Sequence, residues 1–265
     1  MVPAISPGYH PDFVSAAQRI ETPMAQEATR VAIVTGAGRG IGRAIALRLA
    51  QADYSLALVS RTIEELAETR RLTGLPANRA LIILVDLTDP AAPANLFEAA
   101  LEHFGRVDVL VNNAGWAPPR TPLVKARADD LDQMIGVNLR APIMLAQLAA
   151  SHMARRSDGV IVNIASQAAR SQTAGEAVYS ATKAGLVAFT RACFAEFRAI
   201  GVRTSVIIPG LTDTALIPAN KRLDRTAMLQ PDDIASAVMN VIEAPAGVCP
   251  VAIALEPSRD PMIRR

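Results

Sequence analysis

Two residues whose side chains can move a proton, Tyr179 and Lys183, stand four positions apart at the start of an apolar helical run. Four residues make about one helical turn, so both side chains lie on one face of the helix. A phenol has a pKa of about 10, but a lysine cation one turn away favours the phenolate and lowers that pKa. The pair therefore suits general acid or base catalysis on an alcohol or carbonyl. Taken alone the spacing is weak, because ordinary helix surfaces also show it.

A glycine-rich segment far upstream gives this pair a context. Residues 35–42 read Thr-Gly-Ala-Gly-Arg-Gly-Ile-Gly, between a predicted strand and a predicted helix. Glycine is needed where a tight turn brings the backbone close to a pyrophosphate and packs the helix against the strand. Backbone N–H groups at the helix start then hold the anion. The segment predicts a dinucleotide site rather than a merely structural turn. The residues of this site are Gly36, Gly38, Arg39, Gly40, Ile41 and Gly42.

Alternating strands and helices must position these two motifs. Short aliphatic runs predict strands at residues 30–35, 55–60, 80–85, 107–111, 160–165, 203–208 and 251–255. Helical patterns occupy residues 41–51, 63–72, 92–104, 128–155, 178–200 and 231–244. This alternation predicts an α/β fold with a doubly wound, seven-stranded parallel sheet and helices on both faces. We expect one domain over residues 30–265, preceded by a flexible or interface-covering extension at 1–29 in which Met24 is an alternative start.

The motifs, taken in chain order, resemble those of the short-chain dehydrogenase/reductase family. The matching positions are the glycine loop, residues 112–115 (Asn-Asn-Ala-Gly), Asn138, Ser166, Tyr179 with Lys183, and Pro209-Gly210 with Thr214. Together they span residues 31–255. One departure is Ala165, since the family often has two serines at this strand end, but Ser166 keeps the usual separation of 13 residues from Tyr179. The resemblance implies a Rossmann-like domain that binds a nicotinamide cofactor.

The resemblance also implies roles for four catalytic residues. Tyr179 donates a proton to the carbonyl oxygen, and Lys183 lowers the tyrosine pKa and binds the nicotinamide ribose. Ser166 holds and polarises the substrate oxygen. Asn138 disrupts its helix and holds a water that links Lys183 to solvent. The other cofactor contacts implied are Asp86 and Leu87 beside the adenine, Asn113, Ala114 and Gly115 along the adenosine ribose, and Pro209, Gly210 and Thr214 after the sixth strand.

The end of the second strand favours NADP(H) over NAD. An NAD site usually has an acidic residue here for the ribose hydroxyls, whereas this chain has Ser60 and Arg61. The planar guanidinium of Arg61 suits the adenosine 2′-phosphate, with Arg39 as a second partner and Ser60 as a hydrogen-bonding group. An NAD-dependent alcohol dehydrogenase of the same family is the alternative.

The substrate is predicted less sharply than the cofactor. Candidate pocket residues are Trp116, Ser166, Gln167, Glu176, Leu211 and Leu216. Residues 211–230, which include Pro218, should form a short lid. Its three basic residues, Lys221, Arg222 and Arg225, either attract an acidic or acyl-carrier-bound substrate or, as we favour, form a solvated face. Much of the chain resembles 3-oxoacyl-acyl-carrier reductases, so we expect a ketoreductase of that or a broad carbonyl type. A catalytically idle, NADPH-sensing protein is the second hypothesis.

Composition excludes several other classes. The net charge is +2 without a basic run, which argues against a nucleic-acid partner. Two cysteines and three scattered histidines provide neither a disulfide framework nor metal-ligand spacing. The chain has no apolar run long enough for a membrane span and no secretory signal pattern, so we expect a cytoplasmic protein without membrane contact. By resemblance, we expect a homotetramer or homodimer.

Overall fold

The structure of the protein is a computed structural model that describes residues 29–171, 173–217, 220 and 222–262. The predicted N-terminal extension, apart from Thr29, lies outside the described residues, as do Pro218 and Lys221 of the predicted lid.

A seven-stranded parallel sheet forms the centre of the molecule, in the order β3-β2-β1-β4-β5-β6-β7. The strands are β1 (Val31–Thr35), β2 (Ser55–Ser60), β3 (Ala80–Leu84), β4 (Val109–Asn112), β5 (Gly159–Ile164), β6 (Val202–Pro209) and β7 (Ala252–Leu255). The predicted doubly wound sheet is thus confirmed, with strand ends displaced by at most two residues. The order reverses between β1 and β4, and such a switch point is where open α/β sheets bind ligands.

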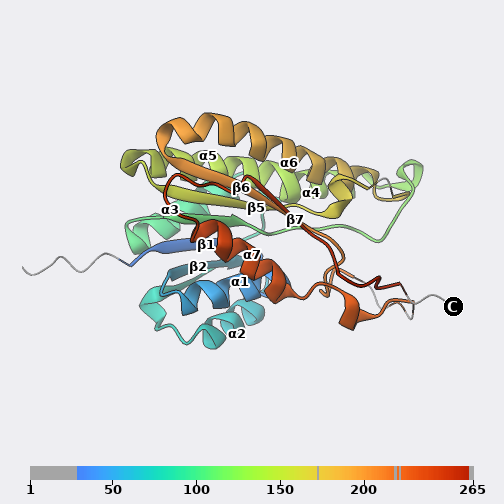
Figure 1. Cartoon of the computed structure of the whole chain (residues 1–265), viewed down its shortest axis with the longest axis horizontal. Helices are drawn as coiled ribbons and strands as arrows, with labels where there is room; N and C mark the ends of the chain where they lie inside the picture. The colour runs from blue at the N-terminus through green and yellow to red at the C-terminus, as the bar shows by residue number, and fades with distance from the viewer. Residues whose placement is uncertain (1–28, 172, 218–219, 221, 263–265) are drawn as a thin grey trace, which may run out of the picture.

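Helices cover both faces of the sheet (Figure 1). They are α1 (Gly40–Gln51), α2 (Ile63–Thr73), α3 (Ala92–Phe104), α4 (Ala128–Ile135), α5 (Ala141–Met153), α6 (Ala177–Phe197) and α7 (Pro231–Ile242). Helices α1, α2 and α7 lie on one side, and α3, α4, α5 and α6 on the other. Alternate strand residues face opposite sides, so Ala32 and Val34 pack toward α1 and α7, while Ile33 packs toward α3 and α5.

One predicted helix is interrupted. The pattern at residues 128–155 predicted a single helix, but a π-helical segment, Gly136–Arg140, separates α4 from α5. This segment contains Asn138, whose side chain is fully buried. A π-helical turn inserts one extra residue per turn and often occurs at functional sites. The expectation that the helix is disrupted around Asn138 is therefore confirmed.

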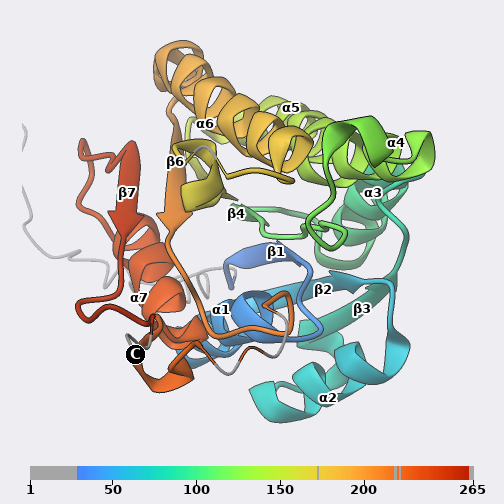
Figure 2. The ribbon, with the colours of Figure 1, turned by 90° about the vertical axis from the view of Figure 1, so that its right-hand side faces the viewer.

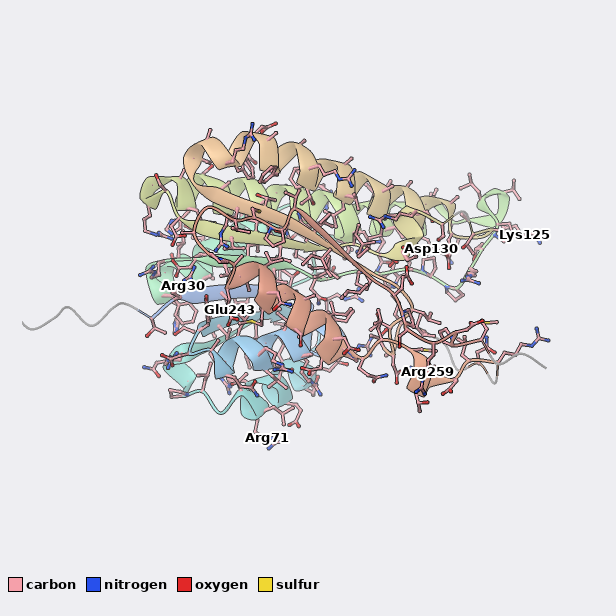
Figure 3. The ribbon with its side chains drawn as sticks, viewed as in Figure 1. Arg30, Arg71, Lys125, Asp130, Glu243 and Arg259 are labelled. Carbon is pink, nitrogen blue, oxygen red and sulfur yellow. The ribbon has the colours of Figure 1, made fainter. Side chains whose placement is uncertain are left out.

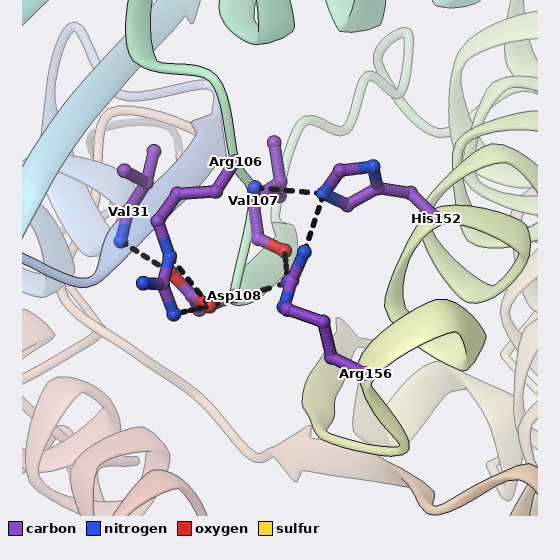
Figure 4. Close-up of polar contacts among 6 residues, drawn as sticks. All are labelled: Val31, Arg106, Val107, Asp108, His152 and Arg156. Carbon is purple, nitrogen blue, oxygen red and sulfur yellow. Dashed lines mark hydrogen bonds and ion pairs between the residues drawn. The ribbon is translucent and has the colours of Figure 1, made fainter. Parts of the chain in front are cut away.

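A buried aspartate ties the amino-terminal edge of the sheet together (Figure 4). Asp108, just before β4, is 1% exposed and accepts a hydrogen bond of 2.8 Å from the backbone N–H of Val31 in β1. Arg106 donates to the same carboxylate, and Arg156, after α5, lies 3.3 Å from it. His152 of α5 accepts hydrogen bonds from Arg156 and the backbone N–H of Val107. This cluster lies at the opposite end of the strands from the glycine loop and Tyr179.

Candidate active site

A cleft of about 1150 Å³ lies at the carboxyl ends of β1, β4, β5 and β6. Figure 2 looks onto the loops that leave these strands. Every residue predicted to bind cofactor or substrate lines this cleft, as do Ser166, Tyr179 and Lys183. Asn138 is not part of the lining, since it is buried behind the wall. The chain therefore brings all the motifs to one place, with the glycine loop at one end and Tyr179 further along.

The glycine loop has the conformation that close approach to an anion requires. Gly36 and Gly40 have φ angles of +66° and +54°, a region that side chains disfavour. A Cβ on Gly42 would lie 2.1 Å from the carbonyl oxygen of Gly36, so only glycine fits there. Helix α1 starts at Gly40 with neither a side-chain cap nor an acidic residue in its first turn. Its first N–H groups and positive dipole end are thus suited to a pyrophosphate, and the residues fit a dinucleotide.

Hydrogen bonds lock the glycine loop to the turn after β4. The Thr35 hydroxyl accepts from the backbone N–H groups of Asn113 and Ala114, at 3.0 and 2.9 Å. In return, the Asn113 side chain donates to the Thr35 carbonyl at 2.9 Å. A Cβ on Gly36 would lie 2.8 Å from the Asn113 amide nitrogen, so the two turns are closely packed. Thr214 approaches from the other side, with its methyl group 3.6 Å from a Cβ placed on Gly40.

The residues predicted for the adenosine end are together at the outer end of the cleft. The Arg61 guanidinium lies 3.9 Å from the Asp86 carboxylate, and both side chains are about half exposed. Leu87, which also lines the cleft, is buried. Arg39 lies 3.4 Å from the carboxylate of Glu65, a residue of α2 that also lines the cleft. The two arginines predicted to bind a phosphate are thus each paired with a carboxylate.

The residues predicted to transfer a proton lie together where β5 faces the start of α6. Ser166, two residues after the end of β5, lies beside Tyr179, and its hydroxyl lowers the pKa of the phenol. Lys183 is 4% exposed, and its ammonium donates to the carbonyl oxygen of Ile164 at 2.9 Å. The same nitrogen lies 5.9 Å from the centre of the Tyr179 ring. The predicted grouping of serine, tyrosine and lysine is therefore present, but the lysine points at the strand backbone rather than at the phenol oxygen.

The expected lowering of the Tyr179 pKa by Lys183 is not found. Burial raises the pKa of the Tyr179 phenol above its ordinary value, and the Glu176 carboxylate raises it further. The hydrogen bond from Ser166 acts in the opposite direction and is outweighed. Burial also lowers the pKa of Lys183 from 10.5 to about 8. The prediction from helical spacing was wrong because it left out the burial that disfavours the charged form of both groups.

Asn138 shapes the cleft through its neighbour. Its side-chain amide donates to the carbonyl of Trp116 and accepts from the N–H of Trp116, both at 2.8 Å. This two-way clamp fixes the chain just after the Asn-Asn-Ala-Gly turn. A Cβ on Gly115 would lie 3.5 Å from the Asn138 oxygen and 3.6 Å from the Lys183 nitrogen. Asn138 and Lys183 therefore converge on Gly115, while the predicted water between Lys183 and solvent stays a prediction.

Two loops meet over the substrate end of the cleft. Arg120, from the loop after β4, donates to the Glu176 carboxylate at 2.6 Å, and the backbone of Thr121 bonds that of Gly175 at 3.1 Å. Gln167 lines the same end, and its buried side-chain oxygen has no hydrogen-bond partner among the described residues. Glu176 was predicted as a pocket residue, but nothing in the sequence indicated Arg120 as its partner. The contact between Arg120 and Glu176 could not be predicted from a local sequence pattern, because the two residues are 56 positions apart.

The lid differs from its sequence-based description. Leu211 and Leu216 line the cleft as predicted, and Leu216 is 50% exposed. Arg225, however, is not a free surface cation: it bonds the Asp213 carboxylate at 2.7 Å and the carbonyl of Thr214 at 3.0 Å. This arginine holds the lid in its fold and is not available to attract an acidic substrate. Within the described residues, the basic group predicted for the lid is thus reduced to Arg222.

Two further properties concern the described residues alone. In the described part of the chain, no three histidine, cysteine, aspartate or glutamate side chains are grouped so that they could hold a metal ion. Likewise, none of the helices in the described residues has the length and apolar composition to cross a membrane.

Comparison with known proteins finds relatives that are short-chain dehydrogenases or other oxidoreductases. A sequence model of the family described as short chain dehydrogenase matches residues 30–224. An uncharacterized oxidoreductase of Staphylococcus epidermidis is 32% identical over 225 residues, or 85% of this chain and 96% of that protein. A metagenomic short-chain oxidoreductase in complex with NADP is 32% identical with a TM-score of 0.76, covering 87% of this chain and 98% of the other. The 3-ketoacyl-(acyl-carrier-protein) reductase from Brucella melitensis, complexed with NADH, is 28% identical with a TM-score of 0.78, over 87% and 98% of the chains. A serine dehydrogenase complexed with NADP⁺ is 27% identical with a TM-score of 0.75, over 86% and 94%.

Proposed function

The chain belongs to the short-chain dehydrogenase family and is an oxidoreductase, and from this premise we propose that it is an NADP(H)-dependent ketoreductase of the 3-oxoacyl or broad carbonyl type. It interconverts a ketone and a secondary alcohol. The observation that carries the proposal is that Ser166, Tyr179 and Lys183 line the same cleft as the glycine loop. A proton donor and a pyrophosphate site thus share one cavity.

The chain's own residues supply the proton side of the reaction. A bound nicotinamide would supply the hydride. Tyr179, whose pKa is raised by burial, is a protonated phenol at neutral pH and donates that proton to the substrate oxygen. Ser166 hydrogen-bonds the same oxygen and helps to orient the phenol. The Lys183 ammonium is held by the carbonyl oxygen of Ile164. Acid–base help from a positioned phenol accelerates a reaction roughly 10²- to 10⁴-fold.

NADP(H) is proposed on the charges at the adenosine end. Ser60, Arg61 and Arg39 line the cleft there, and a guanidinium suits a phosphate that NAD does not have. Two of the similar structures are NADP complexes, while the Brucella reductase is an NADH complex. The family alone therefore does not decide the cofactor, and the proposal depends on the arginines.

Replacing Tyr179 by phenylalanine tests the mechanism. Oxidation of NADPH is measured over β-keto esters, diketones, quinones and sugar ketones, and nucleotide binding is measured by calorimetry. Tyr179→Phe should lower turnover at least about 100-fold, because the proton donor is lost, and should leave NADPH affinity nearly unchanged. Tyr54→Phe is the matched control, since Tyr54 is 6% exposed and lies outside the cleft lining. Full activity of Tyr179→Phe would refute the assigned role.

The same measurements separate the alternatives. An NAD-dependent alcohol dehydrogenase would turn over faster with NAD⁺ than with NADP⁺ at equal concentrations. A catalytically idle sensor would bind NADPH tightly and oxidise it with no carbonyl compound. The proposal further includes a homodimer or homotetramer located in the cytoplasm and a small-molecule substrate that is free or acyl-carrier-bound. Light scattering at several protein concentrations tests the oligomer.

A further inference from the structure

A carboxylate lies at the point where the cofactor's adenosine phosphate is expected. Glu65, in the first turn of α2, packs directly on the glycine loop: a Cβ placed on Gly38 would lie 2.9 Å from a carboxylate oxygen of Glu65. The same Cβ would lie 3.2 Å from the Ser60 hydroxyl. The carboxylate therefore stands close to Ser60, on the side of the loop that faces the adenosine end of the cleft.

Glu65 is also the partner of Arg39. Its carboxylate lies 3.4 Å from the Arg39 guanidinium, and 31% of the Glu65 side chain is exposed, against 66% of that of Arg39. The Glu65 side chain is thus the more buried of the two, since it packs from α2 against the glycine loop, while the Arg39 side chain extends toward solvent. A phosphate that binds Arg39 and Ser60 must approach this carboxylate or displace it.

We propose that Glu65 is a cofactor-selectivity residue whose carboxylate competes with the adenosine 2′-phosphate for Arg39 and so narrows the preference for NADP(H) over NAD(H). An ionised carboxylate only accepts hydrogen bonds and repels a phosphate dianion, whereas it is compatible with the ribose hydroxyls of NAD. This inference rests on the proposed NADP(H)-dependent function and refines it. The degree of selectivity for NADP(H) is set by the balance of Arg39 and Arg61 against Glu65.

Binding of cofactor fragments tests the proposal without any turnover. The probes are 2′,5′-ADP and 5′-AMP, which differ only in the 2′-phosphate, together with NADP⁺ and NAD⁺, all measured by isothermal titration calorimetry. In Glu65→Gln the side chain keeps its shape and loses its charge. We expect 2′,5′-ADP and NADP⁺ to bind about tenfold more tightly, equivalent to about 1.4 kcal/mol, and 5′-AMP and NAD⁺ to change by less than about threefold.

The chain offers a matched control one residue away. Glu64 is exposed on the same turn of α2, so Glu64→Gln removes the same charge without altering the contact with Gly38. We expect it to change none of the four affinities by more than about twofold, because exposed charges are strongly screened. A third variant, Arg39→Ala, removes the residue for which the two anions compete. In that background Glu65→Gln should gain much less affinity for 2′,5′-ADP.

Several results would overturn the proposal. An equal gain for 2′,5′-ADP and 5′-AMP, the same gain in Glu64→Gln, or an undiminished gain in the Arg39→Ala background would each show that Glu65 does not act through Arg39 on the phosphate. Unchanged affinities in Glu65→Gln, with a wild type that binds NADP⁺, would overturn this inference alone. A wild type that binds neither nucleotide would overturn the proposed function as well. Unfolding curves of each variant show whether it is folded.

Discussion

Replacing Lys183 with methionine should stabilise the protein near neutral pH while removing catalysis. Lys183 is 4% exposed, and burial lowers its pKa from 10.5 to about 8. At about 1.4 kcal/mol per pH unit, keeping this amine charged in the fold costs about 3 kcal/mol. Methionine has a similar length and no charge, but it loses the hydrogen bond to Ile164, which contributes about 1.5–3 kcal/mol. The expected net gain at pH 7 is on the order of 1 kcal/mol.

The difference in the free energy of unfolding between wild type and Lys183→Met should depend on pH. The folded-state pKa lies below the unfolded one, so the folded protein holds fewer protons between pH 8 and 10.5. Stability contributed by the site therefore rises with pH across that window. Below pH 8 the amine is charged in both states and the cost is fully present; above 10.5 it is absent. Lys183→Met should thus be the more stable protein at pH 7 and the less stable one by pH 10.5.

Urea unfolding, followed by circular dichroism at fixed protein concentration, measures the difference between the two proteins from pH 7 to 10.5. Lys125→Met is the matched control, since Lys125 lies at the exposed tip of the loop after β4 (Figure 3). This control should change the free energy of unfolding by less than about 0.5 kcal/mol. A difference between wild type and Lys183→Met that stays constant over this pH range would refute the argument, whatever its sign. So would a variant that is markedly less stable at pH 7.

Two predictions concern the cluster at the amino-terminal edge of the sheet. Asp108→Asn should lower the free energy of unfolding by about 2–4 kcal/mol in urea titrations, because it leaves two arginines beside a neutral, buried side chain. Asp53→Asn is the control: it changes an ion pair whose carboxylate is 81% exposed, and it should lower the free energy of unfolding by less than about 1 kcal/mol. Similar losses for both would contradict the role of burial. For His152, burial and then Arg156 and Arg155 lower the pKa below 6.5, against the pull of Asp108. The wild type should therefore lose stability relative to His152→Gln as the pH falls below about 6.5, and a difference independent of pH would count against it.

The fold could be predicted from the sequence because strands and helices here follow uninterrupted patterns. All five residues of β1 and all six of β5 are buried, and aliphatic runs of this kind are typical of parallel sheets. The helical pattern over residues 128–155 did not show the break between α4 and α5; only the family resemblance implied that the helix is disrupted at Asn138. The break depends on Asn138 reaching the backbone of Trp116, 22 residues away, which is a tertiary contact.

The candidate site was predictable in its membership but not in its electrostatics. The motifs predicted that the glycine loop, Ser166, Tyr179 and Lys183 form one site, and in the structure all of them line one cleft. Spacing along a helix, however, does not show how deeply a side chain is buried. Burial of Tyr179 and Lys183 is the main cause of both pKa shifts and sets their direction. The same limit applies to Arg225, which looked like a solvated cation and instead bonds the lid.

The two ends of the cleft are held by different kinds of contact, and this difference determines where substrate choice must lie. At the cofactor end, backbone groups and the Thr35 hydroxyl form the lock, and glycines leave no room for a side chain. At the substrate end, the loops are joined by side-chain pairs, Arg120 with Glu176 and Arg225 with Asp213. A substitution there alters charge and shape without disturbing the sheet, because no strand depends on those pairs. The residues that select the substrate should therefore be sought among these loops, while changes in the glycine loop should affect every substrate alike.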